Sequence, residues 1–182
     1  VFIWIGSLDW RKSPDLLIDS LAAVKSDDWR LEIVGTGPLL EMATARVHEL
    51  GLAERVTFHG HVARAEVQNL LAQADLHLIT SMSEANTTVI WEAMAAGVPT
   101  LTLDHCGMHD VVCDKCGVRV PPTDYAGTRD RIAAEIEALL ADREKLAALS
   151  EGVASCREQY LWSKRSRRWL DIYRDIIAEA RT

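Results

Sequence analysis

The feature of this sequence that most constrains its fold is an alternation between short apolar runs and longer amphipathic stretches. The apolar runs have the length of strands and the amphipathic stretches that of helices, which is typical of a parallel sheet with crossover helices. The first and fourth runs are nearly unbroken, as expected for strands buried on both faces. Six strands are predicted, over residues 1–6, 31–35, 56–60, 76–80, 99–103 and 118–120.

Helix start signals stand between these runs. Ser13-Pro14-Asp15 offers a capping side chain, a proline suited to the first turn and an acid near the positive end of the helix dipole. Pro38 is expected to open the next helix. The predicted helices cover residues 13–25, 38–50, 64–73, 88–96, 130–141, 143–158 and 163–180. The sequence therefore predicts an α/β, Rossmann-like domain with a six-stranded, mostly parallel sheet flanked by helices.

Length, charge and cysteine content narrow the range of functions. At 182 residues the chain is long enough for one sizeable core, so one domain is expected. Its first residues have the pattern of a buried strand without an initiator Met, and we expect a piece of a longer protein.

No run reaches the roughly 20 apolar residues needed to cross a bilayer. A net charge of -7 argues against nucleic acid as the main ligand. Four cysteines without a signal peptide favour reduced thiols and a cytoplasmic location.

The expected binding edge of this sheet is the one at the carboxyl ends of its strands, because ligands of open parallel sheets bind there. The loops at that edge follow Gly6, Gly35, Gly60, Thr80 and Leu103. These loops contain the most unusual residues of the chain, so functional groups are expected there.

Two glutamates, Glu84 and Glu92, flank the start of the helix that follows the fourth strand, and seven residues separate them. If the helix begins near Thr87, its free N–H groups provide a binding site for a phosphate or a sugar hydroxyl. Carboxylates accept hydrogen bonds from vicinal hydroxyls. The arrangement therefore suits a nucleotide sugar, although by spacing alone two solvated carboxylates are the simpler interpretation.

The segment from Ser81 to Pro99 resembles the paired-glutamate motif of retaining glycosyltransferases of the GT-B type. That family includes sucrose and glycogen synthases and bacterial mannosyl- and polysaccharide transferases. The resemblance covers essentially the whole chain, with its segments in the family's order. The other segments are Gly6-Ser7-Leu8 with Arg11-Lys12, residues 33–38, residues 56–62, and residues 104–112 with 117–121.

The resemblance implies a role as well as a fold, namely the C-terminal, donor-binding half of a GT-B enzyme. Such an enzyme would move a sugar from a nucleoside-diphosphate sugar to an acceptor with retention of configuration, in bacterial polysaccharide or glycoconjugate synthesis. The resemblance assigns Glu84 to the transferred sugar, Glu92 to the ribose hydroxyls and Lys12 to the diphosphate, where a cation stabilises the leaving group. It implies Glu84 and Lys12 as catalytic residues, and as substrate-binding residues Gly6, Ser7, Arg11, Gly35, His61, Val62, Asn86, Thr87, Thr88, Val89 and Glu92.

Two positions depart from the family's pattern. Ser7 stands where the family commonly has an arginine, so one phosphate-binding cation is absent unless Arg11 replaces it. Ala85-Asn86-Thr87 stands where the family commonly has a Gly-aromatic-Gly run. No cofactor and no metal are expected, because cationic side chains and helix N-termini do the work of a divalent ion in this fold.

The expected partners are the nucleotide-sugar donor and the protein's own N-terminal acceptor domain, onto which the helix over residues 163–180 would pack. Aromatic and aliphatic residues interleave with basic ones at helical spacing in this helix. The basic residues of this helix also allow a peripheral contact of the full-length enzyme with the inner face of a membrane. The basic residues are Lys164, Arg165, Arg167 and Arg168.

Other functions on the same fold remain as alternatives. A non-catalytic nucleotide-sugar-binding module, an epimerase and a phosphorylase are each compatible with the pattern. A dehydrogenase ranks last. Gly35-Thr36-Gly37-Pro38 lacks the third glycine of a dinucleotide fingerprint, and no ribose-binding acid ends the next strand.

A stretch rich in cysteine and histidine carries a separate hypothesis. Cys106, His109, Cys113 and Cys116 have a spacing that zinc tolerates, and the last two cysteines alone match a redox pair. An ordinary loop is the simpler interpretation, because no second ligand pair elsewhere supports a metal.

Tryptophan side chains are candidates for stacking on a sugar ring. Trp4 and Trp91 are instead predicted to pack in the core, which leaves Trp10 in the first loop as the candidate for a ligand contact.

Overall fold

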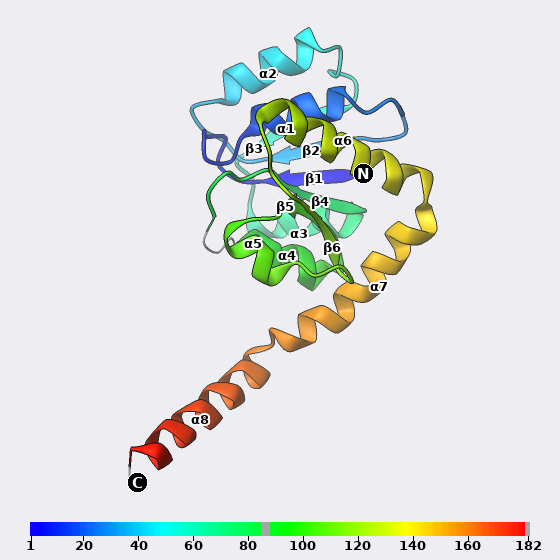
Figure 1. Cartoon of the computed structure of the whole chain (residues 1–182). Coiled ribbons are helices and arrows are strands. Elements are labelled where there is room, and N and C mark those ends of the chain that lie inside the picture. Colours follow the sequence, from blue (N-terminus) through cyan, green and yellow to red (C-terminus); the bar gives the residue numbers. More distant parts are fainter. Residues whose placement is uncertain (85–87, 181–182) are drawn as a thin grey trace.

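The computed structural model describes residues 1–84 and 88–180, and within these ranges the chain forms six strands and eight helices (Figure 1). All strand pairs are parallel and the strand order is β3-β2-β1-β4-β5-β6. The order reverses between β1 and β4, which places the topological switch point of the sheet there. The strands are β1 (Phe2–Ile5), β2 (Leu31–Val34), β3 (Val56–Gly60), β4 (Leu76–Ile79), β5 (Thr100–Leu103) and β6 (Gly117–Val120). The predicted fold class is confirmed.

The helices cover both faces of the sheet. Helix α1 contacts both α2 and α6 on one face, and α3 and α4 pair on the other, where α7 reaches α4. Their bounds are α1 (Pro14–Ala22), α2 (Leu40–Glu49), α3 (Arg64–Gln73), α4 (Thr88–Ala96), α5 (Cys106–Val111), α6 (Tyr125–Ala141), α7 (Arg143–Gln159) and α8 (Trp162–Glu179). The predicted bounds of α3 and α4 agree with the structure to the residue.

The core lies between the sheet and these two helical layers. Trp4 is buried in β1 as predicted, and its indole N–H donates to the Thr80 hydroxyl at 3.3 Å. Trp91 packs against the apolar cluster beneath α4, and its ring lies 4.7 Å from that of Tyr160, so it contacts the end of α7. A buried Trp removes a large apolar surface from water, and a hydrogen bond from its N–H fixes the orientation of the ring.

Several local predictions are wrong. Ser13 occupies the N-cap position of α1 with a φ of 44°, but its side chain donates to the Trp10 carbonyl at 3.3 Å and caps no helix N–H. Helix α2 begins at Leu40 and not at Pro38, because a turn precedes it. Helix α6 begins at Tyr125, five residues before the predicted start, since the Asp124 carboxylate accepts from the N–H of Gly127 at 2.7 Å.

Helix α5 was not predicted at all. The stretch that contains Cys106 and His109 is interpreted from sequence as an ordinary loop, whereas residues Cys106–Val111 form a short helix. Its first residue has a φ of 51°, an uncommon value for a residue with a β-carbon, and its second is a glycine. Neither is a helix start signal, so the helix depends on its tertiary contacts.

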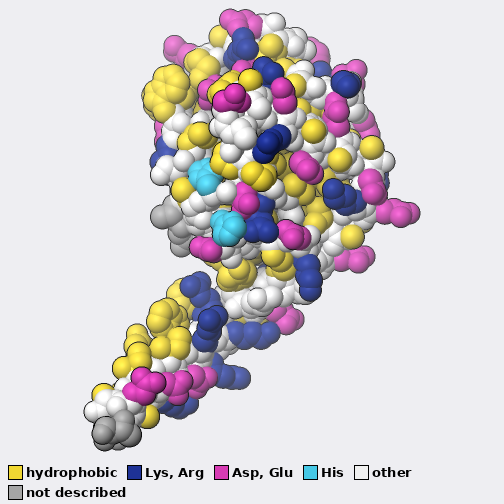
Figure 2. Space-filling view, viewed as in Figure 1, with side chains coloured by type: hydrophobic (Ala, Val, Ile, Leu, Met, Phe, Trp, Pro, Cys, Tyr) yellow, Lys and Arg dark blue, Asp and Glu magenta, His cyan; other side chains and the backbone are white. Residues whose placement is uncertain are grey.

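Helix α8 extends away from the globular part of the chain (Figure 1). Hydrophobic side chains form one face of it and basic side chains another (Figure 2). The exposed hydrophobic residues are Trp162, Trp169, Leu170, Ile172, Tyr173, Ile176 and Ile177. Among the residues that the structure describes, no helix combines the length and apolarity needed to span a bilayer.

Candidate functional site

The loop after β1 and the loop after β4 meet at the carboxyl edge of the sheet. The hydroxyl of Thr80 donates to the carbonyl of Lys12 at 2.9 Å, and the N–H of Met82 donates to the carbonyl of Arg11 at 2.7 Å. The hydroxyl also lies 3.1 Å from the carbonyl of Ser13. These bonds satisfy carbonyls at the start of α1 and fix the two loops to each other. Residues 67 to 71 positions apart in sequence are thereby brought together.

Lys12, Arg11 and Glu84 form the ion-pair junction of these loops. The Lys12 ammonium contacts Oε2 of Glu84, and the Arg11 guanidinium donates to the same oxygen at 3.1 Å. Lys12 is 8% exposed and Glu84 9%, whereas half of the Arg11 side chain reaches solvent. Charges withdrawn from water to this extent persist only when paired. Two cations and a carboxylate predicted to act on one ligand are therefore neighbours in the folded chain.

Nearby groups set the charge balance of this junction. A carboxylate oxygen of Asp9 lies 3.9 Å from the Arg11 guanidinium. Burial lowers the pKa of His77 in β4 to about 3, with the charge of Lys12 acting in the same direction, so this imidazole is neutral at pH 7. The two cations thus face two carboxylates, and the neutral imidazole of His77 adds no positive charge. An incoming anion would compete with Glu84 for Lys12 and Arg11.

Three glycines bring the ends of β1, β2 and β3 close together. The N–H of Gly6 donates to the carbonyl of Val34 at 3.0 Å, and that of Gly35 to the carbonyl of Gly60 at 2.8 Å. Gly35 has a φ of 134°, and a β-carbon there would lie 1.8 Å from the carbonyl oxygen of Gly6. The absence of a side chain at Gly35 therefore permits the approach of the loop that carries Lys12.

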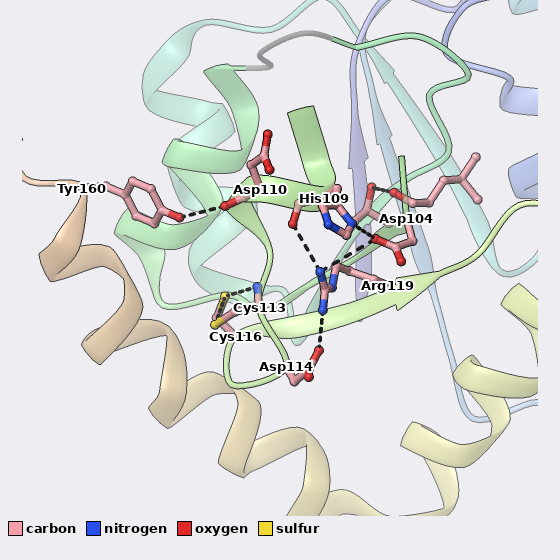
Figure 3. A network of polar contacts seen from close by, with 10 residues as sticks. Asp104, His109, Asp110, Cys113, Asp114, Cys116, Arg119 and Tyr160 are labelled. Atoms are coloured by element: carbon pink, nitrogen blue, oxygen red, sulfur yellow. Dashed lines mark hydrogen bonds and ion pairs between the residues drawn. The ribbon is translucent and has the colours of Figure 1, made fainter. Parts of the chain in front are cut away.

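Helix α5 positions the other side of the junction. The N–H of Gly107 donates to the backbone carbonyl of Glu84 at 3.0 Å. Figure 3 shows the polar network that anchors α5 to the sheet: His109 lies 2.7 Å from Asp104, and Arg119 of β6 donates to the His109 carbonyl at 3.2 Å. The segment missed by sequence reasoning thus helps to place Glu84.

Glu92 lies apart from that junction, on α4. It is half-buried, 3.9 Å from the guanidinium of Arg64, and it faces a groove of about 930 Å³ between α3, α4 and the α7–α8 connection. Thr88 lines the same groove, whereas Lys12 and Glu84 do not. Sequence reasoning missed the residues that line the groove from α7, α8 and their connection, which are Arg157, Tyr160, Leu161, Trp162 and Arg165.

The remaining predicted site residues are distributed along the same edge. Ser7 is exposed after β1, His61 is exposed after β3, and the adjacent Val62 is half-buried. Val89 is half-buried in the first turn of α4. Asn86 and Thr87 lie outside the described residues. Trp10, the tryptophan kept as a candidate for ligand contact, is 71% exposed.

Solved structures resemble this chain closely in fold. The pneumococcal O-GlcNAc transferase, solved in complex with UDP and GlcNAc, superposes with a TM-score of 0.83 at 19% identity, over 97% of this chain and 35% of that one. The Anabaena protein HepE, solved in complex with UDP, superposes with a TM-score of 0.81 at 23% identity, over 96% of this chain and 48% of that one. Both proteins therefore contain this fold within a longer chain.

Curated relatives match the sequence itself. A GDP-mannose-dependent alpha-(1-6)-phosphatidylinositol monomannoside mannosyltransferase of Mycobacterium tuberculosis is 31% identical over 90% of this chain and 44% of its own length. A D-inositol 3-phosphate glycosyltransferase of Salinispora tropica is 29% identical over 100% of this chain and 39% of its own length. The chain thus spans less than half the length of these relatives.

The family model described as "Glycosyl transferases group 1" matches residues 1–154, which include every strand and the Lys12–Glu84 junction. This match, together with the parallel sheet of GT-B type and the curated relatives, shows that the chain belongs to the group 1 glycosyltransferases.

Proposed function

We propose that this chain is the donor-binding half of a glycosyltransferase that transfers a sugar from a nucleoside-diphosphate sugar with retention of configuration. The observation that carries the proposal is the buried junction of Lys12 and Glu84, joined by Arg11, at the carboxyl edge of the sheet. Polysaccharide or glycoconjugate synthesis in the bacterial cytoplasm is the setting that we propose for the full-length enzyme.

The chemistry of the junction suits this reaction. As the glycosidic bond breaks, negative charge grows on the departing nucleoside diphosphate, and Lys12 and Arg11 stabilise it electrostatically. Glu84 holds both cations in place before the donor binds, so little reorganisation is needed when the phosphates arrive. The same carboxylate then accepts hydrogen bonds from hydroxyls of the transferred sugar.

A nucleotide donor is supported by what similar proteins bind. The two solved structures described above are complexes with UDP, and the mycobacterial relative is named as GDP-mannose-dependent. Uridine and guanosine diphosphates are therefore the first nucleotides to test. In this proposal Glu92 binds the ribose hydroxyls, and the groove beside it takes the nucleoside.

We also propose that the hydrophobic face of α8 packs on an N-terminal acceptor domain of the full-length protein. The exposed side chains on this face include Trp162, of which 80% is exposed. The relatives contain more than twice as much chain as is present here. An apolar surface of this kind usually marks an interface.

Calorimetric titration of the chain with uridine, guanosine and adenosine diphosphates and their sugars tests the donor site. We expect one nucleotide to bind without divalent metal. Glu92→Ala should weaken its binding about 10- to 100-fold, because a hydrogen bond to a charged group contributes roughly 1.5–3 kcal/mol.

The matched control is Glu54→Ala, which removes an exposed carboxylate in the turn before β3 and should leave the affinity unchanged. If none of the nucleotides binds, or if Glu92→Ala binds as tightly as the wild type, the assignment of this half as a self-sufficient donor site is wrong. A full-length enzyme that binds the donor but transfers no sugar would identify the non-catalytic module instead.

Glu84→Gln is expected to strengthen the binding of the nucleoside diphosphate and to slow sugar transfer. Removing the negative charge frees Lys12 and Arg11 for the diphosphate, and one charge of this kind changes binding by about 1–2 kcal/mol, or roughly 5- to 30-fold. The free nucleoside diphosphate should therefore bind more tightly, while kcat of the full-length enzyme falls. Calorimetry and a product assay measure the two effects. Weaker diphosphate binding in Glu84→Gln would contradict the competition described here.

A further inference from the structure

Three thiols from two distant segments converge beneath the α5–β6 turn. The Sγ atoms of Cys113, Cys116 and Cys156 all lie within 4.8 Å of one another. Cys113 is 3.6 Å from Cys116 and 3.1 Å from Cys156, sulfur to sulfur. Figure 3 shows Cys113 and Cys116 facing each other beside α7. We propose that these three cysteines form a thiolate site for one thiophilic divalent cation of the zinc class.

The backbone of the turn between Cys113 and Cys116 contributes to the arrangement of the sulfurs. The N–H of Cys116 donates to the Cys113 carbonyl at 2.9 Å, which closes the turn. The N–H of Cys113 also donates to the Cys116 sulfur at 3.4 Å. Donors aimed at a sulfur stabilise the thiolate that a metal requires.

The approach of α7 to this turn is tight and direct. A β-carbon at Gly152 would lie 1.8 Å from the carbonyl oxygen of Lys115, so the glycine lets the helix touch the turn. Cys156 is four residues further along, and residues four apart share a helix face. The packing of α7 against the turn therefore places the Cys156 thiol beside the other two.

The distances favour a metal over a disulfide. A tetrahedral zinc ion with Zn–S bonds of about 2.3 Å separates its sulfurs by roughly 3.8 Å. The 3.6 Å pair already matches this spacing, and the 3.1 Å pair needs to open by well under 1 Å. A disulfide of about 2.05 Å would need the closer pair to move about 1 Å together and would leave the third thiol unused.

The surroundings provide both enclosure and access. Cys116 and Cys156 are buried in an apolar cluster, while Cys113 reaches solvent, so an ion can enter from that side. Within the described residues no fourth protein ligand joins the three sulfurs. A water molecule or a small thiol from solution then completes the coordination. Cys106 and His109, which the sequence grouped with these cysteines, lie outside the cluster, and Cys156 replaces them.

Titration of the reduced full chain with Co²⁺ and then Zn²⁺ under anaerobic conditions tests this site. We expect a thiolate-to-cobalt charge-transfer band that saturates at one ion per chain and disappears when Zn²⁺ displaces Co²⁺. Cys113→Ala, at the solvent side, and Cys156→Ala should each weaken binding at least about 100-fold, because even residues behind a ligand cost 10- to 100-fold when lost. Circular dichroism of the variants checks that they fold.

The matched control is Cys106→Ala, which removes the exposed thiol outside the cluster and should bind like the wild type. The proposal is overturned if the wild type gives no charge-transfer band, or if folded Cys113→Ala and Cys156→Ala bind as well as it does. It is also overturned if oxidised glutathione joins Cys113 to Cys156 in a chain that binds no metal, since the cluster would then be a redox pair. None of these readouts depends on nucleotide binding or sugar transfer.

Discussion

Lys12→Met in the full-length enzyme is expected to lower kcat about 10²- to 10³-fold, the usual cost of losing one preorganised group that stabilises developing charge. Methionine keeps the aliphatic stem, so the packing of the buried side chain is largely retained. The KM for the donor should change much less, because the ammonium acts most strongly when the leaving diphosphate gains charge. Steady-state kinetics with a radiolabelled donor sugar measures both quantities.

Arg11→Met is the matched control at the neighbouring position. It also removes a cation that contacts Glu84, but half of its side chain is exposed and solvent screens its charge. We expect a loss of kcat of about tenfold or less. Equal losses in the two variants would mean that Arg11, and not Lys12 alone, stabilises the leaving group, as Ser7 at the family's arginine position suggests.

A double-mutant cycle separates catalysis from positioning. If Lys12 served only to hold Glu84, the variant with both Lys12→Met and Glu84→Gln would be no slower than Glu84→Gln alone. We expect a further loss of kcat in the double variant, since in the proposed roles the Lys12 ammonium binds the diphosphate and the Glu84 carboxylate binds the transferred sugar. Breaking a buried pair also destabilises the fold, so thermal unfolding of each variant accompanies the kinetics.

The sheet and most helices could be predicted because their signals are local. Apolar runs such as the one beginning at Phe2 mark buried strands, and helical periodicity with flanking breakers marks α3 and α4. Family membership followed from short segments that lie at strand ends, where their order along the chain is fixed by the topology. The positions of Lys12 and Glu84 on facing loops are a direct consequence of that order.

Tertiary contacts decided what the sequence did not reveal. Ser13 does not cap α1, because its hydroxyl donates to the Trp10 carbonyl, while Thr80, 67 residues away, holds the Ser13 carbonyl. Helix α5 has weak local signals and is held by the Asp104–His109–Arg119 network. Cys156 lies 43 residues from Cys113, and no spacing rule connects them. Each of these features depends on which elements pack together.

Gly35→Ala is expected to lower the free energy of unfolding by about 4 kcal/mol, because it adds backbone strain to a steric clash. The φ of 134° at this position is strained for any residue with a β-carbon, and the new carbon would lie 1.8 Å from the Gly6 carbonyl oxygen. That carbonyl belongs to backbone, so no flexible side chain can move aside. Urea unfolding followed by tryptophan fluorescence gives the free energy.

Gly51→Ala provides the matched control, because Gly51 also has a positive φ, 70°, but no atom lies within 4 Å of the added carbon. It should cost about 1 kcal/mol, the penalty of the left-handed conformation alone. The difference between the two variants therefore reports the contact between the ends of β1 and β2 together with the greater backbone strain at Gly35. Since that contact places the loop that carries Lys12, Gly35→Ala should also weaken nucleotide binding in the fraction that remains folded, whereas Gly51→Ala should not. Similar unfolding free energies for the two variants would show that the clash is relieved by movement of the β1 loop, and nucleotide affinity would then report that movement directly.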